Sequence, residues 1–161
     1  MNIDLKILDD RYNNEWPMPA PATEGSAGID LRAANMTEEP GGDMLSQGEL
    51  PLNPNVSYLF GTGIAIHIAD PNYCAMIYPR SGLGHKHGLI LGNGTGVIDS
   101  SYTGEIKVSL WNRSDRPYTI EPGERIAQLV LMPIIRPEFR VVSEFADTER
   151  GSGGFGSTGT G

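Results

Sequence analysis

The chain has 161 residues and a formal net charge of −8, a length that suits one domain of ordinary size. The acidic excess argues against binding to DNA or RNA polymers, which requires a basic face. Charged residues make up 20% of the chain and hydrophobic residues 39%, which excludes a disordered chain and allows one core. The 21 glycines and 12 prolines indicate many turns and argue against a helical bundle.

The single cysteine excludes an internal disulfide bond. Cys74 lies in an apolar run, so we expect a buried and unreactive thiol. No apolar run approaches the roughly 20 residues that cross a bilayer, and the first residues lack the apolar core of a signal peptide. These features predict a cytoplasmic protein that does not bind membranes.

Apolar and polar residues alternate in residues 27–32, 64–68 and 106–111, which is typical of half-buried strands. Residues 126–132 are apolar almost throughout and predict a strand covered on both faces. Turn-forming residues separate these runs at short intervals. The pattern therefore predicts an all-β fold, either a sandwich, a jelly roll or a barrel.

Few residues depart from this pattern. One short helical turn is expected near residues 81–87, and residues 38–51 are expected to form an exposed loop. Residues 1–149 are interpreted as the β domain. Residues 150–161 are almost all Gly, Ser and Thr, and their composition alone predicts a flexible tail.

Residues 96–106 hold one acid and one aromatic side chain between glycines. Asp99 is either a general base that orients water or a turn former. Tyr102 offers a flat, rigid wall for a small planar ligand. Just upstream, the amide of Asn93 supplies a donor and an acceptor for a base edge, or else Asn93 is a turn residue.

Residues 79–84 combine a guanidinium, a hydroxyl and two glycines at a strand end, which suits a phosphate but is also found in ordinary turns. Gln128 lies inside an apolar strand. An unpaired buried amide costs about 1–3 kcal/mol, so Gln128 either faces a binding site or is satisfied by backbone. Both interpretations stay open.

Asp30 is either a solvated residue on a half-buried strand or a water-mediated ligand of Mg²⁺, which prefers oxygen. His85 and His87 are a weak metal pattern and are interpreted as surface or structural residues. Residues 150–159 offer backbone N–H groups, hydroxyls and one arginine, which could form a phosphate nest or a disordered tail. They lack the lysine and helix of a P-loop.

Taken together and in this order, five segments resemble the motifs of the deoxyuridine triphosphatase (dUTPase) family, specifically its bacterial homotrimeric class. The motifs correspond to residues 27–31, 79–84, 96–102, 125–129 and 150–159. The likeness extends from about residue 20 to residue 159. It implies a distorted jelly-roll subunit of the β-clip type and a homotrimer in which three subunits build each site. It also implies Mg²⁺-dependent hydrolysis of dUTP to dUMP and pyrophosphate.

The resemblance also implies roles for individual residues. Asp99 would activate water for in-line attack on the α-phosphorus, and Asp30 would reach Mg²⁺ through water. The residues that would bind substrate are Arg80, Ser81, Gly82, Asn93, Gly96, Tyr102, Gln128, Arg150, Phe155, Gly156, Ser157 and Thr158.

The same resemblance implies which part of the substrate each of these residues would contact. Asn93 and the neighbouring backbone would read uracil, and Tyr102 would lie under the deoxyribose and leave no space for a 2′-hydroxyl. The residues that would hold the α- and β-phosphates are Arg80, Ser81 and Gln128. Those that would close over the γ-phosphate are Arg150, Ser157 and Thr158, with Phe155 stacked on the base.

Two alternatives belong to other classes. A dCTP deaminase on the same scaffold needs a glutamate beside C4 of the base, but residues 93–102 contain none and Glu105 falls beyond them. The other alternative is a nucleotide-dependent signalling module or a structural jelly roll without turnover. The presence of all five motifs favours the hydrolase.

Overall fold

The computed structural model describes residues 1–37, 44–46, 49–149 and 151–152, and this part of the chain is built mainly from antiparallel strands. The strands are β1 (Asp4–Ile7), β2 (Ile29–Arg32), β3 (Asn35–Thr37), β4 (Met44–Ser46), β5 (Leu50–Leu52), β6 (Ser57–His67), β7 (Tyr73–Pro79), β8 (Leu89–Leu91), β9 (Gly96–Ile98), β10 (Glu105–Asn112), β11 (Tyr118–Ile120) and β12 (Arg125–Pro133). The helices are α1 (Arg11–Asn14) and the π-helical turn η1 (Leu83–His87).

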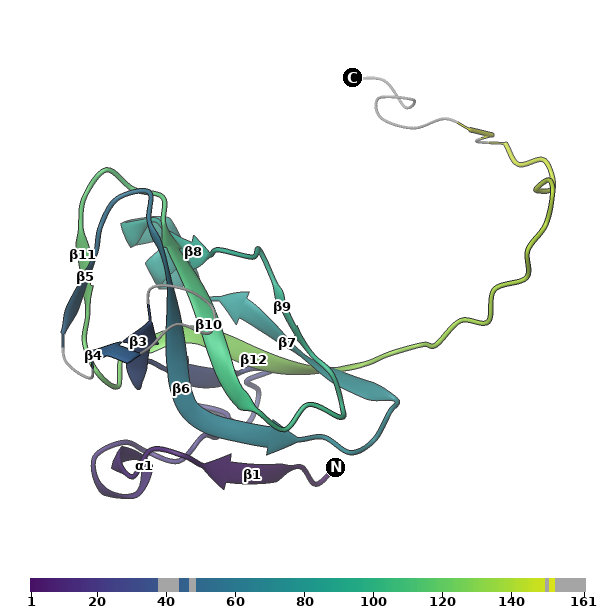
Figure 1. The fold of residues 1–161 in the computed structure, drawn as a ribbon. Coiled ribbons are helices and arrows are strands. Elements are labelled where there is room, and N and C mark those ends of the chain that lie inside the picture. The colour runs from purple at the N-terminus through teal and green to yellow at the C-terminus, as the bar shows by residue number, and fades with distance from the viewer. Residues whose placement is uncertain (38–43, 47–48, 150, 153–161) are drawn as a thin grey trace.

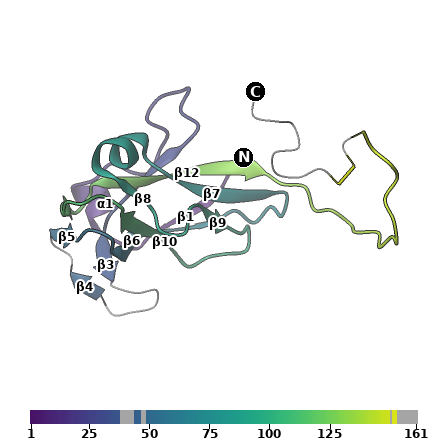
Figure 2. The ribbon, with the colours of Figure 1, turned by 90° about the horizontal axis from the view of Figure 1, so that it is seen from above.

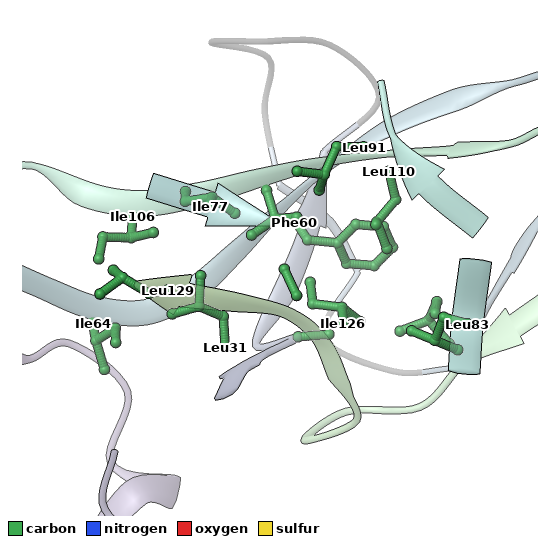
Figure 3. Packing of buried hydrophobic residues seen from close by; sticks show 14 of the residues in the cluster. Leu31, Phe60, Ile64, Ile77, Leu83, Leu91, Ile106, Leu110, Ile126 and Leu129 are labelled. Atoms are coloured by element: carbon green, nitrogen blue, oxygen red, sulfur yellow. The ribbon is translucent and has the colours of Figure 1, made fainter. Parts of the chain in front are cut away.

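The strands form two main sheets and a small third one (Figure 1). The first sheet has the order β4-β3-β6-β10-β8, with β1 also paired to β6, and the second has the order β2-β12-β7-β9. The third consists of β11 and β5. Side chains from both main sheets meet in one core, such as Phe60 and Leu110 from the first and Leu31 and Leu129 from the second (Figure 3). The predicted all-β fold is confirmed.

Successive side chains of a strand point to opposite faces, and β10 shows how this builds the core. Ile106, Val108 and Leu110 are buried while Lys107 is exposed, as the alternation predicted. For β12 the prediction of burial on both faces holds only near its start. Ile126, Ala127 and Leu129 are buried, whereas the residues from Val130 onward are only partly buried or exposed, and Met132 is 40% exposed.

Three further predictions meet the structure here. Cys74 is buried, as expected, and a short helical turn does occupy residues 83–87. The exposed loop predicted over residues 38–51 is wrong for β4 and β5. Each forms a three-residue strand: β4 pairs with β3, and β5 pairs with β11. Such strands are too short to show a periodic pattern. Residues 38–43 and 47–48 lie outside the described part.

The chain leaves the sandwich after β12. Residues 134–149, the connecting segment, contain no strand or helix and run away from the two sheets (Figures 1 and 2). Four large apolar side chains of this segment are at least 90% exposed, namely Ile135, Phe139, Val141 and Phe145. The residues expected to form a flexible tail lie outside the described part, apart from residues 151–152. Within the described residues, no helix has the length and apolarity to span a membrane.

One buried side chain ties the end of β10 to its surroundings. Asn112 is fully buried, and its Nδ2 donates to the carbonyl oxygens of Leu52, at 2.8 Å, and Arg116, at 2.7 Å. Its Oδ1 accepts from the backbone N and the Oγ of Ser114 at 3.0 and 2.7 Å. The amide is therefore satisfied on both sides, and it holds the loop that follows β10.

We expect Asn112→Ala to lower the free energy of unfolding by about 3 kcal/mol, because it leaves buried carbonyl groups without donors. The measurement is urea unfolding followed by circular dichroism. Asn72→Ala is the matched control, since within the described residues that exposed amide hydrogen-bonds to Asp70 alone, and its loss should change stability by less than about 0.5 kcal/mol. Equal effects of the two substitutions would contradict the assigned role of Asn112.

Candidate active site

The second sheet brings three predicted site residues to one end. Gln128 on β12 is paired with Asp30 on β2 and with Tyr78 on β7. Arg80 follows β7 directly, two residues after Tyr78. Antiparallel pairing of neighbouring strands therefore places a carboxylate, an amide and a guanidinium side by side, although they lie far apart in the sequence.

The carboxylate of Asp30 is shared by two arginines. Its Oδ1 lies 3.0 Å from Nε of Arg80, and its Oδ2 lies 3.0 Å from Nη1 of Arg125. Arg80 also donates through Nη1 to the carbonyl oxygen of Arg125 at 3.2 Å. Two cations around one anion leave this cluster with a net positive charge, which in an otherwise acidic protein suits a polyanionic ligand.

Sequence reasoning assigned no role to Arg125. A charged residue at the start of an apolar strand looks like an ordinary solvated end, and only the pairing of β12 with β2 brings it to Asp30. Asp30 itself is not simply solvated, as one interpretation held, because both of its oxygens are ion-paired.

For Gln128, backbone supplies one of the partners of the amide. Its Nε2 donates to the carbonyl oxygen of Pro79 at 3.1 Å. A Cβ on Gly28 would come within 2.9 Å of its Oε1, so any side chain there would force the amide to shift. The same hydrogen bond holds Gln128 beside the turn that carries Arg80. Ser81 and Gly82 are exposed in that turn.

A long hairpin runs from β8 through β9 to β10, and its two arms separate in the middle. Near its base Leu91 pairs with Leu110, and Gly92 N donates to the carbonyl oxygen of Ser109 at 3.0 Å. Beyond that point β9 pairs with β7 in one sheet, while β10 pairs with β6 in the other. The hairpin closes at its tip in a turn, where Tyr102 N donates to the carbonyl oxygen of Asp99 at 3.1 Å.

The separation leaves β9 as an edge strand whose outer side faces the opening of the hairpin. Unpaired N–H and C=O groups on such an edge can recognise a flat heterocycle. Asn93 is exposed in the turn before β9, and Gly96 is the first residue of the strand. The structure thus brings the two predicted base-reading residues to one edge.

Asp99 and Tyr102 lie at the closed tip of the hairpin. Asp99 is exposed, and among the residues described its carboxylate takes part in no hydrogen bond or ion pair. The Tyr102 hydroxyl donates to the carbonyl oxygen of Glu105 at 2.9 Å, and the side chain is 42% exposed. A free carboxylate beside a half-exposed ring suits a base that works on a bound ligand.

Within one chain these two groups are not brought together. Because Ala75 pairs with Ile98, Asp99 lies opposite Cys74, six residues before Arg80 along the direction of β7. Six residues of strand span about 20 Å. The remaining predicted site residues lie outside the described part: Arg150, Phe155, Gly156, Ser157 and Thr158.

The donor groups allow one kind of metal site. The described residues contain no group of three or more His, Cys, Asp or Glu side chains that could enclose an ion. Mg²⁺ commonly binds through one or two carboxylates, phosphate oxygens and water rather than through a protein cage. Asp30 lies within the arginine cluster, and each of its ion-paired oxygens has a second lone pair that fits such an outer-sphere contact through water. His87 lies instead against Tyr118, with ring centroids 4.7 Å apart.

Tyr118 links the two segments that carry the arginines. Its ring contacts His87 at the end of η1, and its hydroxyl donates to Oε1 of Glu124 at 2.9 Å, next to Arg125. Burial, followed by the hydrogen bond to Glu124, raises the pKa of Tyr118 to about 12.

The fold and the site define a class of protein: an all-β domain with an arginine cluster that suits a polyanion and an open hairpin edge that suits a flat heterocycle. Comparison with known proteins agrees, since the dUTPase family model matches residues 14–159. The chain belongs to the dUTPase family.

Relatives and solved structures that resemble the chain are also dUTPases. The deoxyuridine 5′-triphosphate nucleotidohydrolase of Actinobacillus pleuropneumoniae serotype 5b is 57% identical over 98% of this chain and 97% of its own length. That of Idiomarina loihiensis is 55% identical over the same shares. The dUTPase of Staphylococcus bacteriophage 80alpha, solved with dUpNHpp, has a TM-score of 0.76 and 26% identity over 99% of both chains.

A pH-dependent effect follows from Tyr118. Its pKa is raised above the ordinary value of 10, so the folded state keeps a proton that the unfolded chain releases. Stability from this group is present below about pH 10 and is lost as pH rises to about 12. We expect Tyr118→Phe to reduce the fall in the urea midpoint between pH 10 and 12. Parallel losses in variant and wild type would contradict this.

Proposed function

We propose that the protein hydrolyses dUTP to dUMP and pyrophosphate, which lowers dUTP and supplies dUMP for thymidylate synthesis in the cytoplasm. One observation carries the proposal: a net-positive cluster of Arg80, Arg125 and Asp30 in an acidic member of the dUTPase family. Phosphoryl transfer requires from a protein mainly positioning and charge neutralisation, and this cluster offers both.

The arginine cluster holds the α- and β-phosphates, together with Ser81, Gly82 and Gln128. Asp30 and the carbonyl of Arg125 fix the plane of the Arg80 guanidinium, so that its remaining N–H groups point in a set direction. Mg²⁺, when bound, neutralises charge on the triphosphate, and Asp30 would hold it through water.

The opening of the hairpin reads the base. The Asn93 amide and the free edge of β9, starting at Gly96, offer donors and acceptors to uracil, and cytosine presents the reverse pattern at one ring edge. The Tyr102 ring lies under the deoxyribose. Asp99 accepts a proton from the water that attacks the α-phosphorus in line with the departing pyrophosphate.

The deaminase alternative is not favoured. The one glutamate near the hairpin tip is Glu105, and its Oε1 accepts a hydrogen bond from Gly63 N of β6 at 2.9 Å. That carboxylate is half-buried against the first sheet rather than free beside a base. A release of ammonia from dCTP would overturn this conclusion.

The active protein is a homotrimer whose sites are shared between subunits. Asp99 and Arg80 of one chain lie about 20 Å apart along the sheet, too far to act on one α-phosphate. The hairpin tip of one subunit therefore serves the arginine cluster of another. The connecting segment leads away from its own sandwich, which favours an arm, residues 150–161, that closes over a neighbour's site. In that arm the residues that meet the γ-phosphate and base are Arg150, Phe155, Gly156, Ser157 and Thr158.

We expect Asp99→Asn to lower kcat for dUTP by about 10²–10⁴-fold, because the variant loses the general base, and to leave binding of a non-hydrolysable dUTP analogue largely intact. Pyrophosphate release and calorimetry measure the two effects. Asp115→Asn, at a side chain that is 91% exposed, is the control and should leave both unchanged. Near-normal turnover in Asp99→Asn would remove Asp99 from the mechanism.

Deletion of residues 150–161 should abolish most turnover while native mass spectrometry still detects trimers, because a closing arm excludes water. When this truncated chain and Asp99→Asn are unfolded and refolded together, activity should partly return, since mixed trimers contain complete sites. Each chain refolded alone should stay inactive. Mixed trimers without activity would show that the arm serves its own subunit.

A further inference from the structure

We infer that Gly104 and Glu105 are positioning residues that fix the Tyr102 ring and thereby set the selectivity for deoxyribose over ribose. The inference rests on the proposed role of Tyr102. It assigns to two neighbouring residues the rigidity on which that role depends.

The Tyr102 ring, and not the backbone conformation of Gly104, explains why this residue is a glycine. Its φ angle lies outside the left-handed region that usually explains a glycine in a turn. A Cβ at this position would lie 2.6 Å from Oη of Tyr102, 2.8 Å from its Cζ and 3.2 Å from its Cε2. The phenol ring therefore rests directly on the backbone of Gly104, where no larger residue fits unless the ring moves.

Glu105 anchors the tip of the same ring. Its carbonyl oxygen accepts the Tyr102 hydroxyl at 2.9 Å. That carbonyl is itself held, because Glu105 pairs with Ala65 on β6 and its side chain accepts from Gly63 N. Gly61 leaves room for the carboxylate, since a Cβ there would come within 2.6 Å of Oε1. The first sheet thus fixes the acceptor on which the ring depends.

The ring is also held at its own backbone, where Tyr102 N donates to Asp99. With its main chain, its tip and one face fixed, the ring presents its other, exposed face as a rigid wall. A pocket rejects a ligand that merely adds a hydroxyl by only about 10²-fold, so a wall that yields slightly loses most of its discrimination. Rigidity, more than the presence of an aromatic ring, then determines how strongly UTP is excluded.

The test compares kcat/KM for dUTP with kcat/KM for UTP. Gly104→Ala should lower this ratio by about tenfold or more, because the new methyl group displaces the ring. Tyr102→Phe, which removes only the anchor to Glu105, should lower it less. Gly25→Ala is the matched control, since Gly25 has a φ outside the left-handed region and no atom of the described residues lies within 4 Å of its Cβ position, so the ratio should not change. An unchanged ratio in Gly104→Ala would overturn the inference.

A double-mutant cycle separates a ring effect from a general structural one. In a Tyr102→Ala background, Gly104→Ala should have no further effect on the ratio, and an undiminished effect would overturn the inference. If Gly104→Ala alone does not fold, the double variant should fold, because the clash is gone, and its failure to fold would also overturn it.

The same assays distinguish this inference from the proposed dUTP hydrolysis and the proposed role of Tyr102, on which it rests. Wild-type protein that does not release pyrophosphate from dUTP would overturn both. Tyr102→Ala with an unchanged ratio would remove the sugar-selecting role of Tyr102 and the inference with it. Lost selectivity in Tyr102→Ala beside normal selectivity in Gly104→Ala would overturn the inference alone.

Discussion

The hairpin from β8 to β10 is divided between two sheets, and most of the site depends on that division. Because β9 joins β7 while β10 joins β6, the arms separate, and an edge of unpaired backbone groups faces the opening. The same division carries Asp99 to the end of β9 that lies away from Arg80. A single packing constraint thus creates the surface proposed to recognise a base and separates the proposed general base from the arginine cluster of its own chain.

The arginine cluster shows a second constraint. Two guanidinium groups close to each other repel, and a single carboxylate between them reduces this cost while keeping a positive net charge. Asp30 contributes orientation as well, because it engages Arg80 through Nε and so fixes the guanidinium plane. Removing the carboxylate would add positive charge but would also free the arginine to adopt many conformations.

The alternation of apolar and polar residues in β10 was enough to predict that strand and its buried face, because successive side chains point to opposite faces in any sheet. The order of five motifs was enough to indicate the family. What could not be predicted depends on pairing between distant segments. Arg125 looks ordinary until β12 lies beside β2, and Gly104 looks like any turn glycine until the Tyr102 ring lies on it. Short strands such as β4 and β5 lack the length to show a period.

The connecting segment has a consequence for how a newly made chain assembles. Phe139 and Phe145, each at least 90% exposed, find no cover on their own sandwich. In a homotrimer with exchanged arms, neighbouring subunits would bury such side chains, so completion of the fold would wait for collision with other copies. Activity would then depend on protein concentration by mass action, and dilution would inactivate the enzyme without any change within the individual β-sandwich.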